Sequence, residues 1–169
     1  MVEVRIARMD EYGVAGLITA RAYEEFVDLG GPDEDLLYLR RIADVADRAS
    51  RATVLVAIDE GTIVGSLTLE LHRRTNADDD PLPDHRAHIR MLGVDPDTRA
   101  RGAGRALMRA AEERARASGK TEITLHTTSL MTAAHRMYES MGYERTPDEV
   151  LPDGFVLMGY RKGFSGSTS

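Results

Sequence analysis

The segment from Val94 to Met108 constrains the fold more than any other part of this chain. A short apolar run ends at Val94, a loop with Gly102 and Gly104 follows, and helical periodicity begins there. A further β-rich run starts at Thr121, so the order strand, helix, strand predicts two parallel strands joined by a crossover helix. The predicted fold class is therefore α/β.

The rest of the chain supplies further strands and helices for such a sheet. Two β-rich runs flank the turn sequence Asp59-Glu60-Gly61, which predicts an antiparallel hairpin. In the first helix, Val14, Leu17 and Ile18 are expected to face the core, and the polar stretch 73–86 is expected to be a mobile loop. The spacing of apolar residues predicts strands over Val2–Met9, Thr53–Ile58, Thr62–Leu71, His88–Val94, Thr121–Thr127 and Phe155–Arg161, and helices over Glu11–Asp28, Asp33 to near Arg51, Gly102–Ser118 and Thr132–Met141.

Length and composition limit the class of protein. The 169 residues fit one domain, placed at residues 1–163, with residues 164–169 as a tail that is expected to be disordered. The absence of cysteine excludes disulfides and thiolate chemistry and is compatible with the cytoplasm. A net charge of −6 opposes a broad nucleic-acid or anionic-membrane surface, and no apolar run reaches the roughly 18 residues of a membrane span.

The loop before the crossover helix has the chemistry of an anion site. Gly102 and Gly104 let main-chain N–H groups approach a phosphate closely, and the helix dipole favours negative charge at this end. Arg99, Arg101 and Arg105 add positive charge. A dinucleotide motif would need a glycine at position 107 and a P-loop would need one at position 114, and neither is present. The spacing therefore indicates neither NAD nor ATP.

Two motifs resemble those of the GNAT superfamily of acyl-CoA N-acetyltransferases. Arg99-x-x-Gly102-x-Gly104, after a Val-Asp-Pro strand end, resembles the family's pyrophosphate-binding motif. The segment Ala134-x-x-Met137-Tyr138-Glu139-x-Met141-Gly142-Tyr143 resembles its later helix motif. The order of elements from Val2 to about Lys162 is also similar. The resemblance implies a mixed central sheet with an antiparallel N-terminal hairpin and splayed parallel strands, flanked by about four helices.

The resemblance also implies acetyl-CoA as the acyl donor and a set of residues that would hold it. The pantetheine arm would lie in the gap between the splayed strands, and a main-chain N–H near Leu92 would steady the oxyanion. Met131 stands where many family members carry an asparagine, so that contact is either missing or supplied by Thr128 or Ser129. The expected donor-binding residues are Leu92, Gly93, Val94, Arg99, Arg101, Gly102, Ala103, Gly104, Arg105, Thr128 and Tyr138.

The expected reaction is direct transfer of an acetyl group to a primary amine of a small molecule or peptide. By the same resemblance, Tyr138 is the expected acid for the departing thiolate. His88 is the expected base, with an ordinary pKa near 6.5, and Glu70 on the neighbouring hairpin strand is the runner-up. A non-catalytic acyl-CoA-binding module of the same fold is the alternative. It remains an alternative because Met131 replaces the asparagine that many family members carry. Two copies could pair as a homodimer.

The remaining polar side chains concern metals and the acceptor. None of the five histidines forms a ligand pair on one helix, so no metal site is expected. The acidic run Asp78–Asp80 is interpreted as a solvated loop or, as a second reading, a lid that steers a cationic amine. The acceptor would be shaped by the first two helices and this loop, with these candidates: Tyr23, Glu24, Glu25, Phe26 and Tyr38.

Overall fold

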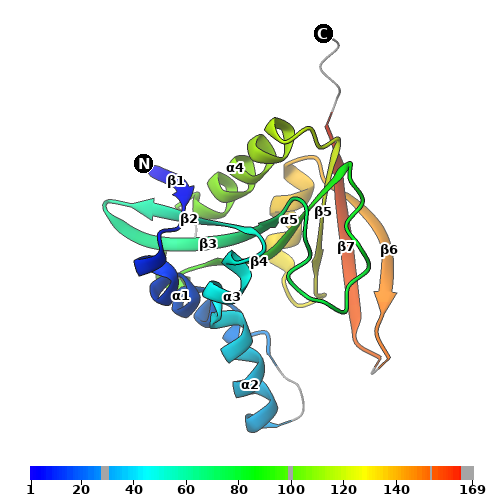
Figure 1. Cartoon of the computed structure of the whole chain (residues 1–169). Helices are drawn as coiled ribbons and strands as arrows, with labels where there is room; N and C mark the ends of the chain where they lie inside the picture. The colour runs from blue at the N-terminus through cyan, green and yellow to red at the C-terminus, as the bar shows by residue number, and fades with distance from the viewer. Residues whose placement is uncertain (28–30, 99–100, 153, 165–169) are drawn as a thin grey trace.

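The computed structural model describes residues 1–27, 31–98, 101–152 and 154–164. One seven-stranded sheet runs through the molecule in the order β1-β2-β3-β4-β5-β7-β6, and its parallel pair is β4 and β5 (Figure 1). The strands are β1 (Val2–Ile6), β2 (Thr53–Asp59), β3 (Thr62–Glu70), β4 (Arg86–Val94), β5 (Glu122–Thr127), β6 (Glu144–Val150) and β7 (Val156–Gly163). The helices are α1 (Tyr12–Glu24), α2 (Pro32–Ala43), α3 (Val45–Ala49), α4 (Ala103–Ala117) and α5 (Thr132–Ser140).

Two apolar layers cover opposite faces of the sheet. Alternation along β2 sends Leu55 and Ala57 into the larger core, where they pack with side chains of α4 and α5. Val54 and Val56 point the other way, into a smaller core with residues of α1 and α3. The predicted hairpin is confirmed, because β2 and β3 pair antiparallel across a turn in which Gly61 has a φ of 79°.

The helices between β1 and β2 differ from the expectation. The predicted second helix is two helices, α2 and α3, which meet at Asp44. The φ and ψ of Asp44, −81° and 70°, lie outside the helical region, and its carboxylate caps α3 by accepting a hydrogen bond from the Asp47 N–H. The described residues therefore form five α-helices rather than about four. Strand β6 was not predicted at all.

Helix α1 packs through small side chains instead of the large ones expected. Val14 and Leu17 are 50% and 61% exposed, so the prediction that they face the core is wrong, although Ile18 is buried as predicted. A Cβ on Gly16 would lie 2.0 Å from the carbonyl oxygen of Ala43, so glycine lets α1 and α2 approach closely. This close packing is the reason that small residues occupy the buried face.

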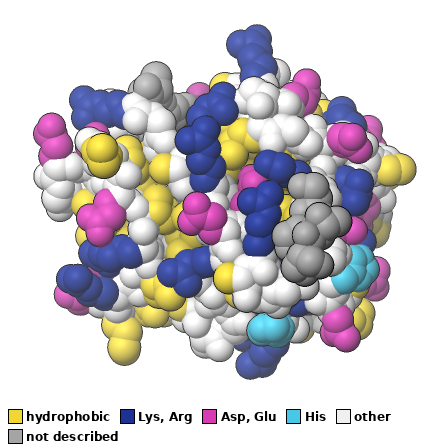
Figure 2. Space-filling model, turned by 90° about the horizontal axis from the view of Figure 1, so that it is seen from above, with side chains coloured by type: hydrophobic (Ala, Val, Ile, Leu, Met, Phe, Trp, Pro, Cys, Tyr) yellow, Lys and Arg dark blue, Asp and Glu magenta, His cyan; other side chains and the backbone are white. Residues whose placement is uncertain are grey.

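The C-terminus and the surface bear on two further expectations. Phe164, the first residue of the expected tail, donates its main-chain N–H to Thr121 and packs against the Arg116 guanidinium, whereas residues 165–169 lie outside the described part. Of the helices described, none is long and apolar enough to cross a bilayer. Basic and acidic side chains are interspersed on the face seen in Figure 2, unlike the one-sign stripe of a typical nucleic-acid surface.

Candidate functional site

Strands β4 and β5 separate in the middle of the sheet. Their parallel pairing runs from Arg86 and Glu122 to Ile89 and Leu125, yet β4 continues to Val94 and β5 to Thr127. On its other side, β4 remains paired with β3 as far as Val94 and Gly65. The main chain of β4 beyond Ile89 therefore borders an opening on the β5 side, where its polar groups can receive a ligand.

A β-bulge lies at this opening. The register between β3 and β4 shifts between the pairs Thr68–Arg90 and Ser66–Gly93, which leaves an extra residue in β4. Met91 has a φ of 53°, rare for a residue with a Cβ, so the chain is locally strained there. Bulges re-aim the groups next to them, and the main chain re-aimed here is that of Leu92, where an oxyanion donor was expected.

The N-terminus of α4 lies beyond the same end of β4. Gly102 precedes the helix with a φ of 87°, and no side chain of the described residues is seen to cap the free N–H groups of the first turn. A Cβ on Gly104 would lie 3.7 Å from Val94 Cγ2 and 3.2 Å from Met137 Sδ of α5. The glycine thus brings the strand end and both helices together around the predicted anion site. Ala103, also predicted there, is buried.

The basic side chains of this loop have mixed surroundings. Arg101 is 61% exposed, with its guanidinium 3.6 Å from the Asp59 carboxylate, an ion pair that solvent weakens. Arg105 donates a hydrogen bond of 2.7 Å to Ser140 Oγ of α5. Arg99 lies outside the described residues. Arg101 and Arg105 accordingly remain close to the start of α4, where they add positive charge.

Tyr138 of α5 is buried in the larger core. Burial raises the pKa of Tyr138, as does the nearby Tyr160. Burial also raises the pKa of Tyr23 in α1. Helices α1 and α5 lie on opposite faces of the sheet, and α1 packs against β4 at Gly93.

The residues at the start of α5 bear on the missing asparagine. Met131 precedes the helix, and its sulfur accepts a 3.4 Å hydrogen bond from Thr127 Oγ1. Thr128 Oγ1 is buried without a hydrogen-bond partner among the described residues. An unpaired buried hydroxyl is costly unless a ligand pairs with it. Thr128 therefore fits the contact that an asparagine at position 131 would otherwise make.

Glu70 lies at the centre of a buried ionic network. It is fully buried, with Arg74 Nε 3.1 Å and Arg90 Nε 3.0 Å from its carboxylate oxygens. The N–H and hydroxyl of Thr75 donate to the same carboxylate at 2.6 and 2.8 Å. Both arginines also pair with Asp79. These contacts leave Glu70 poorly placed to accept a proton as the runner-up base.

The same network corrects the expectation of a mobile loop after β3. Thr75 is held to the sheet by Glu70 of β3 and Asp79 by Arg90 of β4, and Thr75 also accepts a hydrogen bond from Arg51. Residues 74–79 are therefore anchored. Because Asp79 pairs with Arg90 and with Arg74 of the loop itself, its charge is neutralised locally, and the interpretation of this run as a lid for a cationic amine loses one of its three carboxylates.

Two histidines lie beside each other on the α1 side of the sheet. His88 is 3% exposed, its Nδ1 is 2.7 Å from Thr124 Oγ1, and its ring centroid is 5.2 Å from that of His126. Burial, and secondarily His126, lowers the pKa of His88 well below its ordinary value. The expected pKa near 6.5 is therefore wrong. His126, which sequence reasoning did not select, is 39% exposed, and burial lowers its pKa too.

The lowered pKa of His88 predicts a loss of stability in mild acid. In the unfolded chain the His88 imidazole binds a proton near pH 6.5, whereas in the folded chain it stays neutral at that pH. The free energy of unfolding should therefore fall as pH drops below 6.5, by up to about 1.4 kcal/mol per pH unit. Urea unfolding at several pH values measures this slope. His88→Gln should flatten it, whereas exposed His72→Gln should not. A slope unchanged in His88→Gln would contradict the lowered pKa.

A hollow of about 290 Å³ lies on the same side of the sheet as the two histidines. Its walls come from β4, β5, β6, β7 and the loop after β3, and they include His88, His126 and Arg74. This hollow is next to the point where β4 and β5 part. Of the acceptor candidates, Tyr23 and Tyr38 are half-buried and Glu24 is exposed. Burial raises the pKa of Tyr38.

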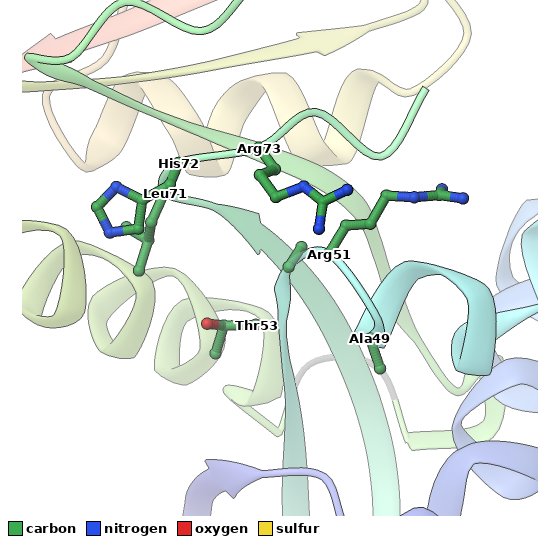
Figure 3. Close-up of a pocket in the computed structure, with 7 residues that line it drawn as sticks. Ala49, Arg51, Thr53, Leu71, His72 and Arg73 are labelled. Carbon is green, nitrogen blue, oxygen red and sulfur yellow. The ribbon is translucent and has the colours of Figure 1, made fainter. Parts of the chain in front are cut away.

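A second hollow lies elsewhere. It is formed where β2 begins and β3 ends, with Arg51 and Arg73 extending to one side and His72 to the other (Figure 3). The register pairs Thr53 with Leu69, at the opposite end of β3 from Gly65, which is opposite Val94. This hollow is therefore not part of the site at the start of α4. Within the described residues, no three His, Asp or Glu side chains form a metal-binding group.

Known proteins resemble this chain in sequence and in fold. Mycothiol acetyltransferase of Saccharopolyspora erythraea is 29% identical over 134 residues, which cover 79% of this chain and 40% of that protein. N-acetylaspartate synthetase of Danio rerio is 32% identical over 100 residues, covering 57% and 32%. The chain thus spans well under half the length of these curated relatives.

Solved structures agree in fold. PaiA N-acetyltransferase from Thermoplasma acidophilum, in complex with coenzyme A, superposes with a TM-score of 0.73 at 14% identity, covering 97% of this chain and 99% of that one. A GCN5-related N-acetyltransferase from Rhodopseudomonas palustris gives 0.71 at 21% identity, covering 96% and 95%. Residues 17–143, well over half of the chain, match the Acetyltransferase (GNAT) family. The chain therefore belongs to the GNAT acetyltransferase family.

Proposed function

We propose that this chain is an N-acetyltransferase that moves an acetyl group from acetyl-CoA directly to a primary amine of a small molecule or peptide. The observation that carries the proposal is the opening between β4 and β5, with its bulge at Met91, next to the uncapped N-terminus of α4. Such an arrangement offers main-chain groups to an amide-containing arm and N–H groups to a pyrophosphate.

The donor would be held by the two parts of this opening. The main chain of Leu92–Val94 would pair with the pantetheine arm, and Thr128 Oγ1 would gain the partner that it lacks. The pyrophosphate would be bound at the start of α4 by main-chain groups and by basic side chains, together with Arg99 outside the described residues: Arg101, Gly102, Ala103, Gly104 and Arg105.

The chain's own residues would manage the protons and the developing charge. The amine attacks the thioester carbonyl, whose oxygen becomes negative and is steadied by the N–H near Leu92. As the C–S bond breaks, Tyr138 donates to the thiolate; its raised pKa keeps the phenol protonated at working pH. The ammonium proton of the acceptor would pass to the pair His88 and His126, both neutral at pH 7, with the more exposed His126 on the outside.

The wider setting is also part of the proposal. The relatives are named for mycothiol and N-acetylaspartate, which favours a small molecule over a peptide as the acceptor. We place the activity in one domain over residues 1–163 and in the cytoplasm, since the chain lacks cysteine. The exposed apolar side chains of α1 and α2, Val14, Leu17, Leu36 and Leu37, support a homodimer.

A non-catalytic acyl-CoA-binding module is the second candidate. The observation in its favour is Met131 at the position of the family's asparagine. Both candidates bind acetyl-CoA, but only the enzyme releases free CoA when amines are added. Release of CoA that depends on an amine therefore separates the two.

Acetyl-CoA should stabilise the fold. At about one hundred times its dissociation constant, it should raise the free energy of unfolding by roughly 2.7 kcal/mol, a shift of several degrees in the melting temperature. Thermal unfolding of protein freed from co-purified ligand measures the shift. NADH and ATP should do much less. A melting temperature that does not respond to acetyl-CoA or CoA would overturn the proposal.

A matched pair of variants tests whether the shift in melting temperature comes from binding at the start of α4. Arg101→Glu places a negative charge beside the predicted pyrophosphate site and should reduce the shift. Arg109→Glu makes the same charge change at an exposed position further along α4 and should leave the shift nearly intact. Equal shifts in both variants would mean that the pyrophosphate does not bind at the start of α4.

A further inference from the structure

Arginines outnumber carboxylates in the lining of the hollow beside the two histidines. Its lining includes Arg74, Arg86 and Arg161 but one carboxylate, that of Glu122, in a chain whose net charge is −6. Resting on the proposed function, we infer that the hollow binds the carboxylate of an acceptor that also carries the primary amine. The acceptor is then an amino acid or a similarly small aminocarboxylate.

Glu122 does not neutralise the arginines around it. Arg86 Nε donates to the Glu122 carboxylate at 3.0 Å, whereas the Arg161 guanidinium is 3.8 Å from the same group, too far for a hydrogen bond. Arg161 is also 43% exposed. Two guanidinium groups thus share one carboxylate, and Arg161 keeps donors for a ligand. Guanidinium donors in this geometry suit a planar carboxylate.

The neighbouring charges leave this imbalance in place: Glu144 of β6 is opposite Arg161 in the register, but it is exposed and no ion pair joins the two among the described residues. Arg74 belongs to the Glu70 network, in which two arginines balance Glu70 and Asp79. The carboxylate of Glu149 in β6 lies 3.8 Å from His126 and is 58% exposed. Burial is the largest cause of the lowered pKa of His88 and His126 is the next, and Arg74 and Arg86 lower it further. The contribution of the two arginines agrees with a positive field in the hollow.

The strand register sets the size of the ligand. Arg161 in β7 is opposite Thr124, and His126 follows two residues later on the same face of β5. Two residues along an antiparallel strand span about 7 Å. A small molecule with its carboxylate at Arg161 can therefore place its amine near His126, at the point where β4 and β5 part. A long peptide is not needed to bridge these groups.

The test compares matched pairs of acceptors. The common amino acids with primary amines and their α-carboxamides are assayed with acetyl-CoA, because the two members of each pair have nearly the same shape and only the amino acid carries the carboxylate charge. The best amino acid should exceed its amide by about ten- to a hundredfold in kcat/KM, the effect of hydrogen bonds to a charged group. The amide has the less basic amine, so intrinsic reactivity alone would favour it.

Three variants locate the preference. Arg161→Gln should reduce kcat/KM for the amino acid by about ten- to a hundredfold and abolish the preference over the amide, and Arg161→Glu should reverse it. Arg109→Gln, on the other face of the sheet, should leave the preference intact. Amides that match or exceed their amino acids in every pair, or a preference that survives in Arg161→Glu, would overturn the inference.

A binding measurement separates this inference from the proposed function. If acetyl-CoA binds and no amine is acetylated, the proposed activity is wrong. NMR then tests independently whether the hollow binds a carboxylate. In protein loaded with CoA, an amino acid should shift the ring resonances of His126 more than its amide does. The absence of such shifts for every amino acid would overturn the inference by itself.

Discussion

Replacing Tyr138 with phenylalanine should lower kcat by roughly ten- to a thousandfold and leave the affinity for acetyl-CoA nearly unchanged, a range typical of acid–base contributions. The variant keeps the ring, which packs between those of Tyr143 and Tyr160 at centroid distances of 6.0 and 5.5 Å. It removes only the hydroxyl of a buried side chain. Steady-state kinetics and calorimetric titration with acetyl-CoA measure the two quantities.

Tyr143→Phe provides the matched control. Tyr143 belongs to the same ring cluster, but its hydroxyl donates a 3.0 Å hydrogen bond to the buried carboxylate of Glu112. Its loss should cost about 1–3 kcal/mol of unfolding free energy and leave kcat near that of the parent. Full activity in Tyr138→Phe, or an equal loss of activity in both variants, would remove Tyr138 as the acid.

Replacing Glu70 with alanine should cost about 3–5 kcal/mol of unfolding free energy, because it leaves Arg74 and Arg90 partly buried without their shared carboxylate. Such a loss is a large part of the stability of an ordinary domain. Urea unfolding measures it. Asp47→Asn, which removes an exposed carboxylate paired with Arg51 at 3.2 Å, should cost less than about 1 kcal/mol.

A second substitution of Glu70 tests whether this residue anchors the 74–79 loop or acts as the catalytic base. Glu70→Gln keeps the shape of the side chain and removes its charge. If Glu70 holds the 74–79 loop, the pH–rate profile of this variant should keep the lower limb of the parent even where the rate falls. Loss of that limb, with a stability close to that of the parent, would restore Glu70 as the base.

Local chemistry made much of the fold predictable. The hairpin depends on a turn sequence, and the helix after Gly102 depends on glycines and on helical periodicity; both are encoded within a few residues. The strands β4, β5 and β7 begin and end within two residues of the predicted bounds. Strand β6 was missed because Thr146-Pro147-Asp148-Glu149 reads as a polar turn, and its pairing with β7 is a tertiary effect.

The candidate site was predictable only where it depends on the main chain. Glycines indicate where the main chain must turn or approach another group closely. The start of α4 could therefore be predicted from Gly102 and Gly104 in the sequence. The Glu70 network joins β3, β4 and a loop, and no spacing in the sequence reveals such a cluster. Alternation along β5 could have identified His126, since it shares a face with Glu122 and Thr124.

The bulge at Met91 has an evolutionary consequence. Main-chain groups aimed by a bulge do not depend on which side chain their residue carries, except that proline would remove the N–H. Most substitutions therefore leave these groups in place while the fold persists. The proposed acceptor face at Arg161 and His126 depends on side chains alone, so under the proposal a single substitution there would change the acceptor. The proposed donor half would then be inherited while the acceptor half diversifies.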